Sequence, residues 1–404
     1  MLTRDARLLF VTRSARMFGY GFLSVVLALY LAAIGLDGLH IGLILTLTLL
    51  GDAAVSLWLT IHADRLGRRR ILVAGALLVV VAGVVFALSN DFWVLLLAAI
   101  IGVISPSGNE VGPFLAVEQA ALSQTIPGPR RTGVFAWYNL VGSVATAIGA
   151  LTAGLLAQAL QSGGSSVLDS YRAIVLGYAA VGMVMAALFL LISPAVEVPA
   201  APPTTIARRL GLHRSQGIVA RLSMLFGLDS FAGGFVIQSL IALWFQQRFG
   251  VEPAVLGAIF FGANLVAGLS ALLAARIAAR IGLINTMVFT HLPSNVLLIL
   301  VPLMPDVRLA IAMLLLRFSI SQMDVPTRQA YTMAVVDPDE RSAAAGVTGI
   351  ARSLGAAASP SIAAPLLAVP GLAAAPFLIA GGLKIVYDLL LYRSMRGVRL
   401  DERD

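Results

Sequence analysis

The sequence predicts an all-α membrane protein in which twelve transmembrane helices form two pseudo-symmetric six-helix bundles. Composition, the number of apolar runs and an internal repeat lead to this prediction. Of the 404 residues, 59% are hydrophobic and only 12% are charged, whereas soluble domains carry about 25% charged residues. A soluble fold of this size has too little interior for so much apolar side chain. Lipid is therefore the expected solvent, which excludes cytosolic enzymes, nucleic-acid binders and secreted domains.

Twelve apolar runs are long enough to cross a membrane. A helix needs about 20 mostly apolar residues to cross a hydrocarbon core of about 30 Å. The fourth and fifth runs exceed that length, which predicts tilt or protruding ends. The predicted spans are residues 16–36, 41–62, 71–89, 92–121, 133–161, 171–193, 221–248, 254–277, 284–304, 308–334, 344–368 and 371–392.

The positions of arginine predict the orientation of these spans. One set of alternate loops and the C-terminus are arginine-rich, whereas the opposite loops hold little beyond Arg172, Arg248 and Arg308. Because cytoplasmic loops are enriched in basic residues, we expect a multi-pass protein of the inner (cytoplasmic) membrane with both termini cytoplasmic. The basic residues 1–20 lack a clear cleavage site and are expected to be a retained cytoplasmic leader. The arginines assigned to the cytoplasm are Arg65, Arg68, Arg69, Arg70, Arg130, Arg131, Arg208, Arg209, Arg214, Arg276, Arg280, Arg341, Arg393, Arg396 and Arg399.

A polar, proline-containing stretch divides the spans six and six. From Ser193 to Arg221 several prolines precede a basic run, which predicts an extended linker followed by a short surface helix. We therefore expect an N-terminal six-helix bundle at 1–193, a central cytoplasmic linker at 194–220 and a C-terminal six-helix bundle at 221–404.

The two halves are related by a degenerate repeat. At a shift of 213 residues Pro113 falls on Pro326 and Gly142 on Gly355, and the loop at 63–67 matches that at 278–282 at a shift of 215. Parallel six-helix halves related by an axis along the membrane normal are described for one large class of secondary transporters.

The loop after the second predicted span carries the motif that identifies a family. Residues 63–70 read Ala-Asp-Arg-Leu-Gly-Arg-Arg-Arg and resemble the loop signature of the major facilitator superfamily, roughly G-x-L-A-D-R-x-G-R-K. The resemblance implies a prokaryotic secondary transporter with twelve spans, whose cavity is lined chiefly by spans 1, 4, 7 and 10. It also implies that the loop acts as a gate, although positive-inside anchoring alone would explain part of its charge. The gating residues so predicted are Asp64, Arg65, Gly67 and Arg68.

The tenth predicted span carries the most informative polar stripe. Its polar side chains are spaced 4, 3, 4 and 3 residues apart, which places them on one helical face. Asp324 and Arg328 can pair as i and i+4, and Pro326 between them favours a kink. Such a stripe cannot face lipid, so it contributes either to a cavity or to a structural ion pair. The stripe consists of Arg317, Ser321, Asp324, Arg328 and Tyr331.

The fourth predicted span should be distorted. Residues 105–113 contain two glycines beside Pro106 and Pro113, and broken helices at membrane depth occur only where they are buried in protein or line a cavity. Glu110 lies in this stretch and is the first candidate proton carrier, with a permanently paired structural role as the alternative.

The remaining intramembrane polar residues complete the predicted site. The further proton-coupling candidates are Asp324, Asp229 and Asp52, and the substrate-cavity candidates are Arg328, Arg352, Arg317, Asn109, Asn139, Tyr20 and Tyr331. Lys384 and Asp388 are expected to form a structural i,i+4 pair, and His291 is expected to be an isolated structural residue.

The chemistry that the sequence lacks narrows the function. It contains no cysteine, no HExxH and no GxxxxGK[ST] loop, so we expect no catalytic residue, no metal site, no cofactor and no enzymatic activity. The partners expected are a small-molecule substrate, protons and membrane lipid, without nucleic acid, and the chain is expected to be a monomer.

The leading prediction is a secondary active transporter that works by alternating access. It would carry out proton-coupled efflux of a drug or metabolite, and the deep arginines suggest an anionic moiety on the substrate. The family exporters' arginine in the fourth span and Gly-Pro signature in the fifth are absent. The alternative is therefore a proton-coupled uptake symporter for an organic anion.

Overall fold

The structure is a computed structural model that describes residues 3–125, 131–197, 212–337 and 339–396. Within these ranges the side chains of residues 64, 123–125, 131–133 and 195 are not described. The chain forms two compact units. Unit 1 comprises Met1–Pro202 and Ile237–Leu265, and unit 2 comprises Pro203–Val236 and Val266–Asp404. The bundle boundaries predicted from the sequence stay a prediction.

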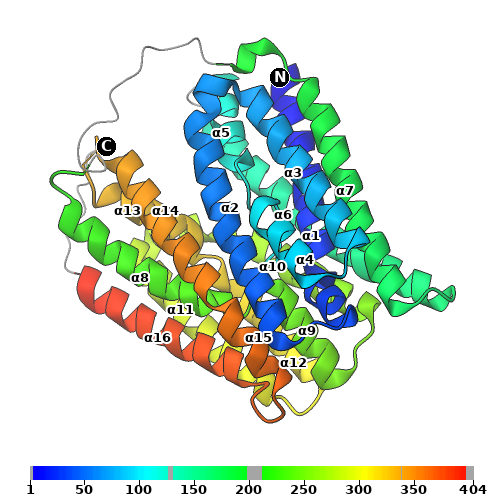
Figure 1. The fold of residues 1–404 in the computed structure, drawn as a ribbon. Coiled ribbons are helices and arrows are strands. Elements are labelled where there is room, and N and C mark those ends of the chain that lie inside the picture. Colours follow the sequence, from blue (N-terminus) through cyan, green and yellow to red (C-terminus); the bar gives the residue numbers. More distant parts are fainter. Residues whose placement is uncertain (1–2, 126–130, 198–211, 338, 397–404) are drawn as a thin grey trace. The chain divides into compact units, whose positions relative to one another are not determined.

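Unit 1 is built on α1, which packs against α6, α7 and α9 (Figure 1). Its other close pair is α3 with α7. Hydrogen bonds join α9 to α1, where Gln238 Nε2 donates to Ser24 Oγ at 2.8 Å, and to the stretch between α4 and α5, where Ser239 Oγ donates to the Pro106 carbonyl at 2.5 Å. Its elements are α1 (Arg4–Ala33), α2 (Gly38–Leu66), α3 (Arg68–Leu88), α4 (Phe92–Ile101), α5 (Phe114–Thr125), α6 (Arg131–Ser162), α7 (Val167–Leu190), η2 (Pro194–Val196), α9 (Gln238–Phe249) and the first part of α10 (Pro253–Ile281).

Unit 2 has two main helix pairs, α8 with α14 and α11 with α16. An apolar cluster from α8, α11, α13 and α16, including Phe226, Met287, Tyr331 and Tyr387, fills its interior. Its elements are α8 (Gln216–Gly234), the last part of α10, α11 (Leu283–Leu300), η4 (Val301–Leu303), α12 (Val307–Ser321), α13 (Asp324–Ala334), α14 (Arg341–Ala358), α15 (Pro360–Ala368) and α16 (Ala375–Met395).

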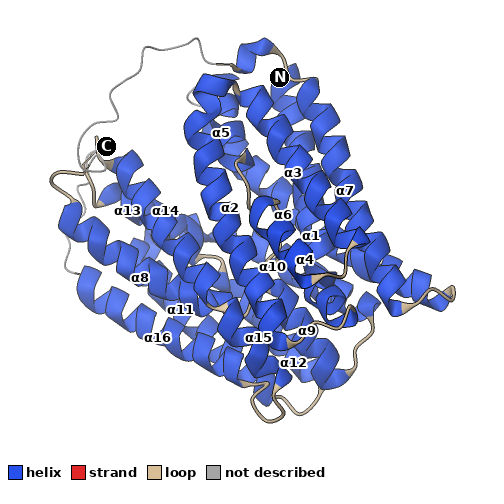
Figure 2. Ribbon diagram, viewed as in Figure 1, coloured by secondary structure: helices blue, strands red, loops and turns tan. Residues whose placement is uncertain are grey.

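The predicted all-α class is confirmed, because the described residues form helices and no strand (Figure 2). Ten helical segments in this part of the chain are long and apolar enough to cross a membrane. The count of twelve is not confirmed. The fourth and the eleventh predicted spans are not among the ten. Each is divided into two shorter helices, the fourth into α4 and α5 and the eleventh into α14 and α15.

Helix breaks fall where the sequence placed prolines and glycines. The chain leaves helical geometry between α4 and α5, and Gly108 and Gly112 there have φ of +70° and +83°. Between α12 and α13 the break lies at Gln322 and Met323, just ahead of Pro326. The reason is that proline lacks the N–H that would bond to the carbonyl four residues earlier, and it is tolerated in a first helical turn.

The internal repeat has a structural counterpart in each unit. In unit 1, α1 and α6 cross closely, and a Cβ on Gly21 would lie 2.0 Å from the Thr146 carbonyl oxygen. In unit 2 the equivalent helices α8 and α14 do the same, and a Cβ on Gly355 would lie 2.3 Å from the Gly227 carbonyl oxygen. Small residues allow such close packing where no hydrophobic effect drives helices together.

The expected N-terminal leader is mostly helix. Thr3 caps α1 by accepting from the Ala6 N–H at 3.2 Å, and the helix runs unbroken from Arg4. Arg13 and Arg16, on that segment, are buried. A retained cytoplasmic leader therefore stays a prediction, and the structure adds that the segment is continuous with the helix of the first predicted span.

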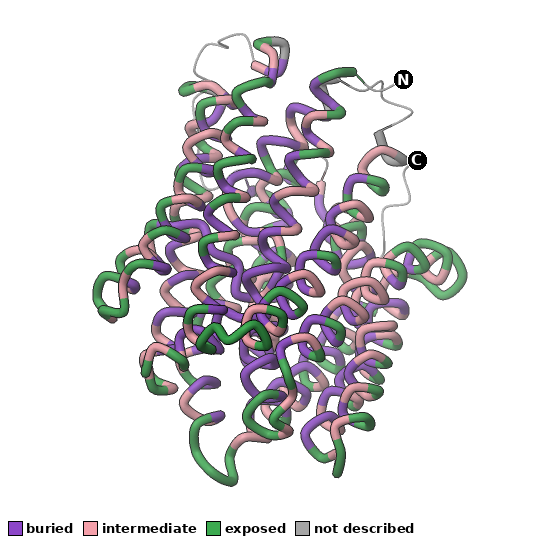
Figure 3. The backbone as a smooth tube through the Cα atoms, turned by 90° about the vertical axis from the view of Figure 1, so that its right-hand side faces the viewer, coloured by how far each residue is buried: buried purple, intermediate pink, exposed green. Residues whose placement is uncertain are grey.

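Burial along the helices fits a lipid solvent (Figure 3). Large apolar side chains are exposed on outer helix faces, among them Leu88, Trp93 and Met224 at 79%, 72% and 70%. Exposed apolar surface on this scale indicates contact with a membrane or with a partner.

Candidate functional site

Unit 1 contains a compact cluster of arginines and glutamates. Arg16, which is 0% exposed, binds Glu118 through Nη1 at 2.8 Å and Nη2 at 2.6 Å, and its Nε donates to Glu110 at 2.7 Å. Arg13 Nη1 donates to the other oxygen of Glu110 at 2.6 Å, and its Nε donates to the Tyr138 carbonyl at 2.9 Å. We refer to Arg13, Arg16, Glu110 and Glu118 as the Arg–Glu cluster. Its charges are fully matched.

Neutral groups complete the Arg–Glu cluster. Thr12 Oγ1 donates to Glu118 at 2.9 Å, and the Tyr138 hydroxyl donates to the same carboxylate. Asn139 accepts from Arg13 at 3.4 Å. Glu118 therefore lies in the interior with Arg16. Arg130 and the Arg131 side chain are outside the described residues.

The broken stretch between α4 and α5 is held by side chains from α1 and α2. Tyr20 Oη donates to the Val111 carbonyl at 2.9 Å, and the Gly112 N–H donates to Asp52 at 2.8 Å. Ser105 Oγ donates to the Asn109 carbonyl at 2.7 Å, while the Asn109 side chain is exposed. These contacts satisfy backbone groups that irregular structure would otherwise leave unpaired.

Asp52, which is half-buried, differs from the carboxylates of the two clusters. It accepts from the Gly112 N–H and from Ser56 Oγ at 3.2 Å, and no described basic side chain forms an ion pair with it. Glu110, Tyr20 and Tyr178 lie within electrostatic range. Asp52 is therefore a carboxyl group whose ionised form is stabilised by hydrogen bonds alone.

Unit 2 gathers a second, larger set of charges around Asp229 on α8. Asp229 pairs with Lys384 of α16 at 2.5 Å and with Arg328 of α13 at 3.0 Å. Arg328 also contacts Asp324 at 3.3 Å, which confirms the predicted i,i+4 pair. All four side chains are at most 8% exposed. We refer to them as the Asp229 cluster.

The Asp229 cluster extends to α11. His291 Nδ1 lies 2.9 Å from Asp388 and its Nε2 lies 3.9 Å from Asp229, and Asn295 donates to Asp388 at 2.8 Å. The predicted isolation of His291 and the predicted Lys384–Asp388 pair were wrong. Lys384 instead pairs with Asp229 on α8. The prediction failed because the i,i+4 rule considers one helix and ignores acceptors on neighbouring helices.

Two arginines of unit 2 have no ion-pair partner among the described residues. Arg317 of α12 and Arg352 of α14 form no ion pair or hydrogen bond with the described residues, and the Nε atom of each is buried without an acceptor. Ser321 Oγ, one turn beyond Arg317, is also buried and unpaired. Both guanidinium groups interact electrostatically with Asp229 and Asp324, which are already occupied by Arg328 and Lys384. Buried polar groups without partners are rare in native proteins and call for an explanation.

The remaining predicted residues lie as follows. The Tyr331 hydroxyl donates to the Met395 carbonyl at 3.4 Å. Of the gating loop, the Asp64 side chain is outside the described residues, and Arg65 is exposed. Gly67 adopts a φ of +96° between α2 and α3, as the tight turn requires, and Gly282 of the repeat does so at +85°. The Arg68 N–H donates to Glu197 of the segment after α7 at 2.7 Å.

Sequence reasoning missed Arg13, Glu118, Lys384, His291 and Asp388 as parts of charged clusters. A signal was present for most of them. Arg13, Arg16, Tyr20 and Ser24 recur every three or four residues on one helical face, as do His291 with Asn295 and Lys384 with Asp388.

Comparison with known proteins identifies the family. The sequence model of the Major Facilitator Superfamily matches residues 9–360, and a second match covers residues 227–396. The chain belongs to this superfamily. A curated relative, "Uncharacterized membrane protein YJR124C" of Saccharomyces cerevisiae, is 31% identical over 98% of this chain and 95% of its own length. Because that relative is eukaryotic, the expected prokaryotic assignment is not confirmed.

Solved transporter structures share the fold. The nucleoside transporter NupG superimposes with a TM-score of 0.74 at 13% identity, covering 97% of this chain and 99% of its own. The D-xylose-proton symporter gives 0.73 at 14% identity, with 96% and 97% covered. The human organic anion transporter MFSD10 gives 0.61 at 19% identity, with 96% and 99% covered. The fold and family are therefore those of secondary transporters of the membrane.

Proposed function

We propose that this superfamily member is a proton-coupled secondary transporter that exports a small organic anion by alternating access. The observation that supports it is that, among the described residues, unpaired charges of opposite sign lie in the two units. Each unit contains charged groups that its own described residues leave uncompensated, and the two units differ in sign.

The anion would bind in unit 2. Four cations lie there, the buried Arg317, Arg328 and Lys384 and the half-buried Arg352. They face the three carboxylates of Asp229, Asp324 and Asp388, so one positive charge remains with His291 counted as neutral. Guanidinium groups form charge-assisted, often bidentate hydrogen bonds with carboxylates and phosphates. The free Nε atoms of Arg317 and Arg352, with Ser321 Oγ, are donors of the kind that a carboxylate or phosphate would satisfy.

The proton would bind in unit 1. A proton carrier must become neutral during the cycle, and a carboxylate between arginines is held ionised. Among the four carboxylates considered, Glu110, Asp229 and Asp324 each have a basic partner within 3.3 Å. Asp52 has none among the described residues, so we place it ahead of Glu110 as the proton site. Glu110 would then act mainly as a structural partner of Arg13 and Arg16.

Export is the direction we favour, from the resemblance to superfamily exporters. The alternative is uptake of an organic anion together with protons. The absence of the exporters' signatures favours it, and one structural neighbour is a proton symporter. In either direction we propose a monomer in the cytoplasmic membrane with both termini in the cytoplasm.

The test is transport by purified protein in liposomes with an imposed pH gradient. Fluorescent 1-naphthoate and 1-naphthyl phosphate serve as anionic probes, and neutral 1-naphthol serves as the control. We expect the anions, but not the alcohol, to accumulate against their gradient when the pH gradient is present. Parallel assays in whole cells and inverted vesicles distinguish export from uptake by direction.

Two results would reject the proposal. Flux that does not respond to the pH gradient would indicate a passive route, and equal flux of naphthol and naphthoate would exclude anion recognition. A variant carrying Arg317→Gln and Arg352→Gln should lose accumulation, whereas Arg276→Gln, at an exposed position on α10, should not.

A further inference from the structure

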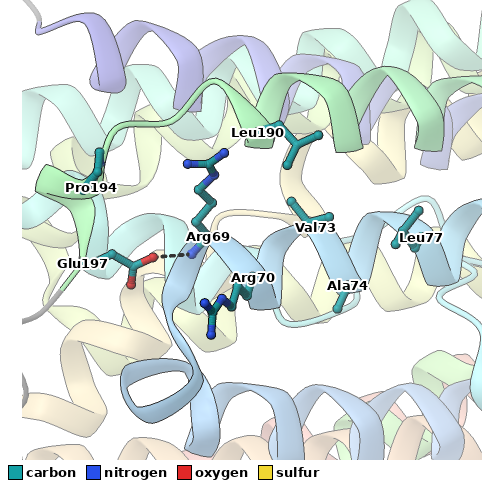
Figure 4. A pocket seen from close by; sticks show the side chains of 8 residues that line it. All are labelled: Arg69, Arg70, Val73, Ala74, Leu77, Leu190, Pro194 and Glu197. Carbon is teal, nitrogen blue, oxygen red and sulfur yellow. Dashed lines mark hydrogen bonds between the residues drawn. The ribbon is translucent and has the colours of Figure 1, made fainter.

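Unit 1 has a groove that the transport proposal does not use. A cavity of about 470 Å³ lies between the first turns of α3, the end of α7 and η2 (Figure 4). Arg69 and Arg70 line one end, and Val73, Leu77 and Leu190 continue it along the two helices. In Figure 4 the Arg69 side chain extends toward α7 and Pro194, and Arg70 extends to the other side of α3.

The basic end of the groove has free cationic groups. No ion pair or hydrogen bond joins the guanidinium groups of Arg69 and Arg70 to any described residue. The nearby Glu197 carboxylate is engaged with the backbone, because it accepts from the N–H groups of Arg68 at 2.7 Å and Arg69 at 3.1 Å. It removes one charge from this end and leaves a net positive charge.

The rest of the groove is lined by apolar, partly exposed side chains. Val73 and Leu77 follow Arg69 at intervals of four residues, so they lie below it on the same face of α3. Leu77 and Leu190 are 51% and 53% exposed. The candidate span on α3 begins at Arg68, which places the arginines at the membrane boundary and the apolar residues within the hydrocarbon.

We propose that this groove binds one anionic phospholipid. Its phosphate contacts Arg69, Arg70 adds positive charge at the same end of the groove, and one acyl chain lies along Val73, Ala74, Leu77 and Leu190. Basic pockets between transmembrane helices recognise anionic headgroups, and the apolar length selects a lipid over a free phosphate. The bound lipid connects α3 to the segment after α7, which should stabilise unit 1 against heat.

The experiment measures binding and thermal unfolding of delipidated protein in detergent. The probes are dioleoylphosphatidylglycerol, dioleoylphosphatidylcholine and glycerol 3-phosphate, which has the phosphate without the acyl chains. We expect phosphatidylglycerol alone to bind and to raise the unfolding temperature. The Arg69→Gln and Arg70→Gln double variant should lose about tenfold or more of that affinity, since each basic residue at a membrane surface adds to binding of anionic lipid.

Two further variants make the result decisive. Arg276→Gln with Arg280→Gln on α10 removes the same charge from exposed positions outside the groove and should leave affinity unchanged. Ala74→Trp fills the apolar part, keeps both arginines and should also abolish binding. Equal stabilisation by glycerol 3-phosphate, equal loss in the α10 variant, or full binding by Ala74→Trp would each overturn the proposal.

Discussion

The Arg–Glu cluster of unit 1 and the Asp229 cluster of unit 2 each hold two cations and two carboxylates, but only the Asp229 cluster has further arginines beside it. In unit 1, Arg13 and Arg16 face Glu110 and Glu118, and each carboxylate oxygen has a donor between 2.6 and 2.9 Å or the Tyr138 hydroxyl. In unit 2, Arg328 and Lys384 are paired, whereas Arg317 and Arg352 have no ion pair or hydrogen bond with the residues that the structure describes.

This difference separates a structural role from a binding role. A buried ion pair whose hydrogen bonds are all made within the protein has nothing to offer a ligand, and removing one member leaves a costly unpaired charge. A buried arginine without an acceptor is costly as it stands, and a bound anion would remove that cost. The same residue type should therefore respond to mutation with opposite sign in the two units.

The largest effect is expected at Arg16. Arg16→Met leaves Glu118 buried without a cation and should lower the free energy of unfolding by about 3–5 kcal/mol, measured by denaturation with SDS. The double variant with Glu118→Met should recover most of that loss, because no unpaired charge remains at this position. A loss below about 1 kcal/mol in Arg16→Met would contradict the structural assignment.

The next effect is expected at Arg317 and Arg352. Changing both to Met should cost about 100-fold in affinity for 1-naphthyl phosphate, at about 1.5 kcal/mol for each hydrogen bond between charged groups. Thermal stability without the anion should stay the same or rise, since a desolvated charge is removed at each position. The affinity of Arg317→Lys for 1-naphthyl phosphate should lie between that of the unchanged chain and that of the double Met variant, because an ammonium cannot bind an anion bidentately. If the Met variants lose as much stability as Arg16→Met does, Arg317 and Arg352 are structural residues like those of the Arg–Glu cluster.

A smaller effect is expected at Asp52. One coupled proton and a pH difference of one unit can supply at most about 1.4 kcal/mol, or tenfold accumulation. Asp52→Asn should abolish that accumulation in liposomes while exchange of labelled for unlabelled 1-naphthoate continues. Glu110→Gln should instead reduce stability. Accumulation that survives in Asp52→Asn and disappears in a folded Glu110→Gln would restore Glu110 as the proton site.

The smallest effect is expected at Glu340, outside the membrane spans. Burial acts to raise its pKa, but hydrogen bonds from Ser215 and from the N–H groups of His213 and Arg214 outweigh it and hold the pKa at about 2. A carboxylate whose folded pKa is depressed stabilises the protein above its unfolded pKa near 4.5 and loses that contribution as pH falls toward 2. Glu340→Gln should therefore lower the unfolding temperature near pH 7, and the difference from the unchanged chain should shrink between pH 4.5 and 2. A difference that is constant over this range would contradict the shift.

The local features of the fold followed from the sequence. Pro106, Gly108 and Gly112 predicted the break between α4 and α5, and the spacing of Arg317, Ser321, Asp324 and Arg328 predicted a buried polar face. Composition and the repeat predicted the all-α class and the related halves. These properties depend on residues within a few turns of one another, which is the range that periodicity and backbone preferences cover.

Only the tertiary structure decided which charges are satisfied. No arginine lies near Glu110 in the sequence, and its partners, Arg13 and Arg16, are 97 and 94 residues away. Lys384 has a carboxylate four residues on and uses Asp229, 155 residues away, instead. A charge in a membrane is stabilised by whatever the packed helices bring within about 3 Å, and a sequence pattern cannot give that distance. The residues that carry the transport proposal, Asp52, Arg317 and Arg352, were candidates from the sequence. That none of them forms an ion pair with the described residues is a property of the folded chain.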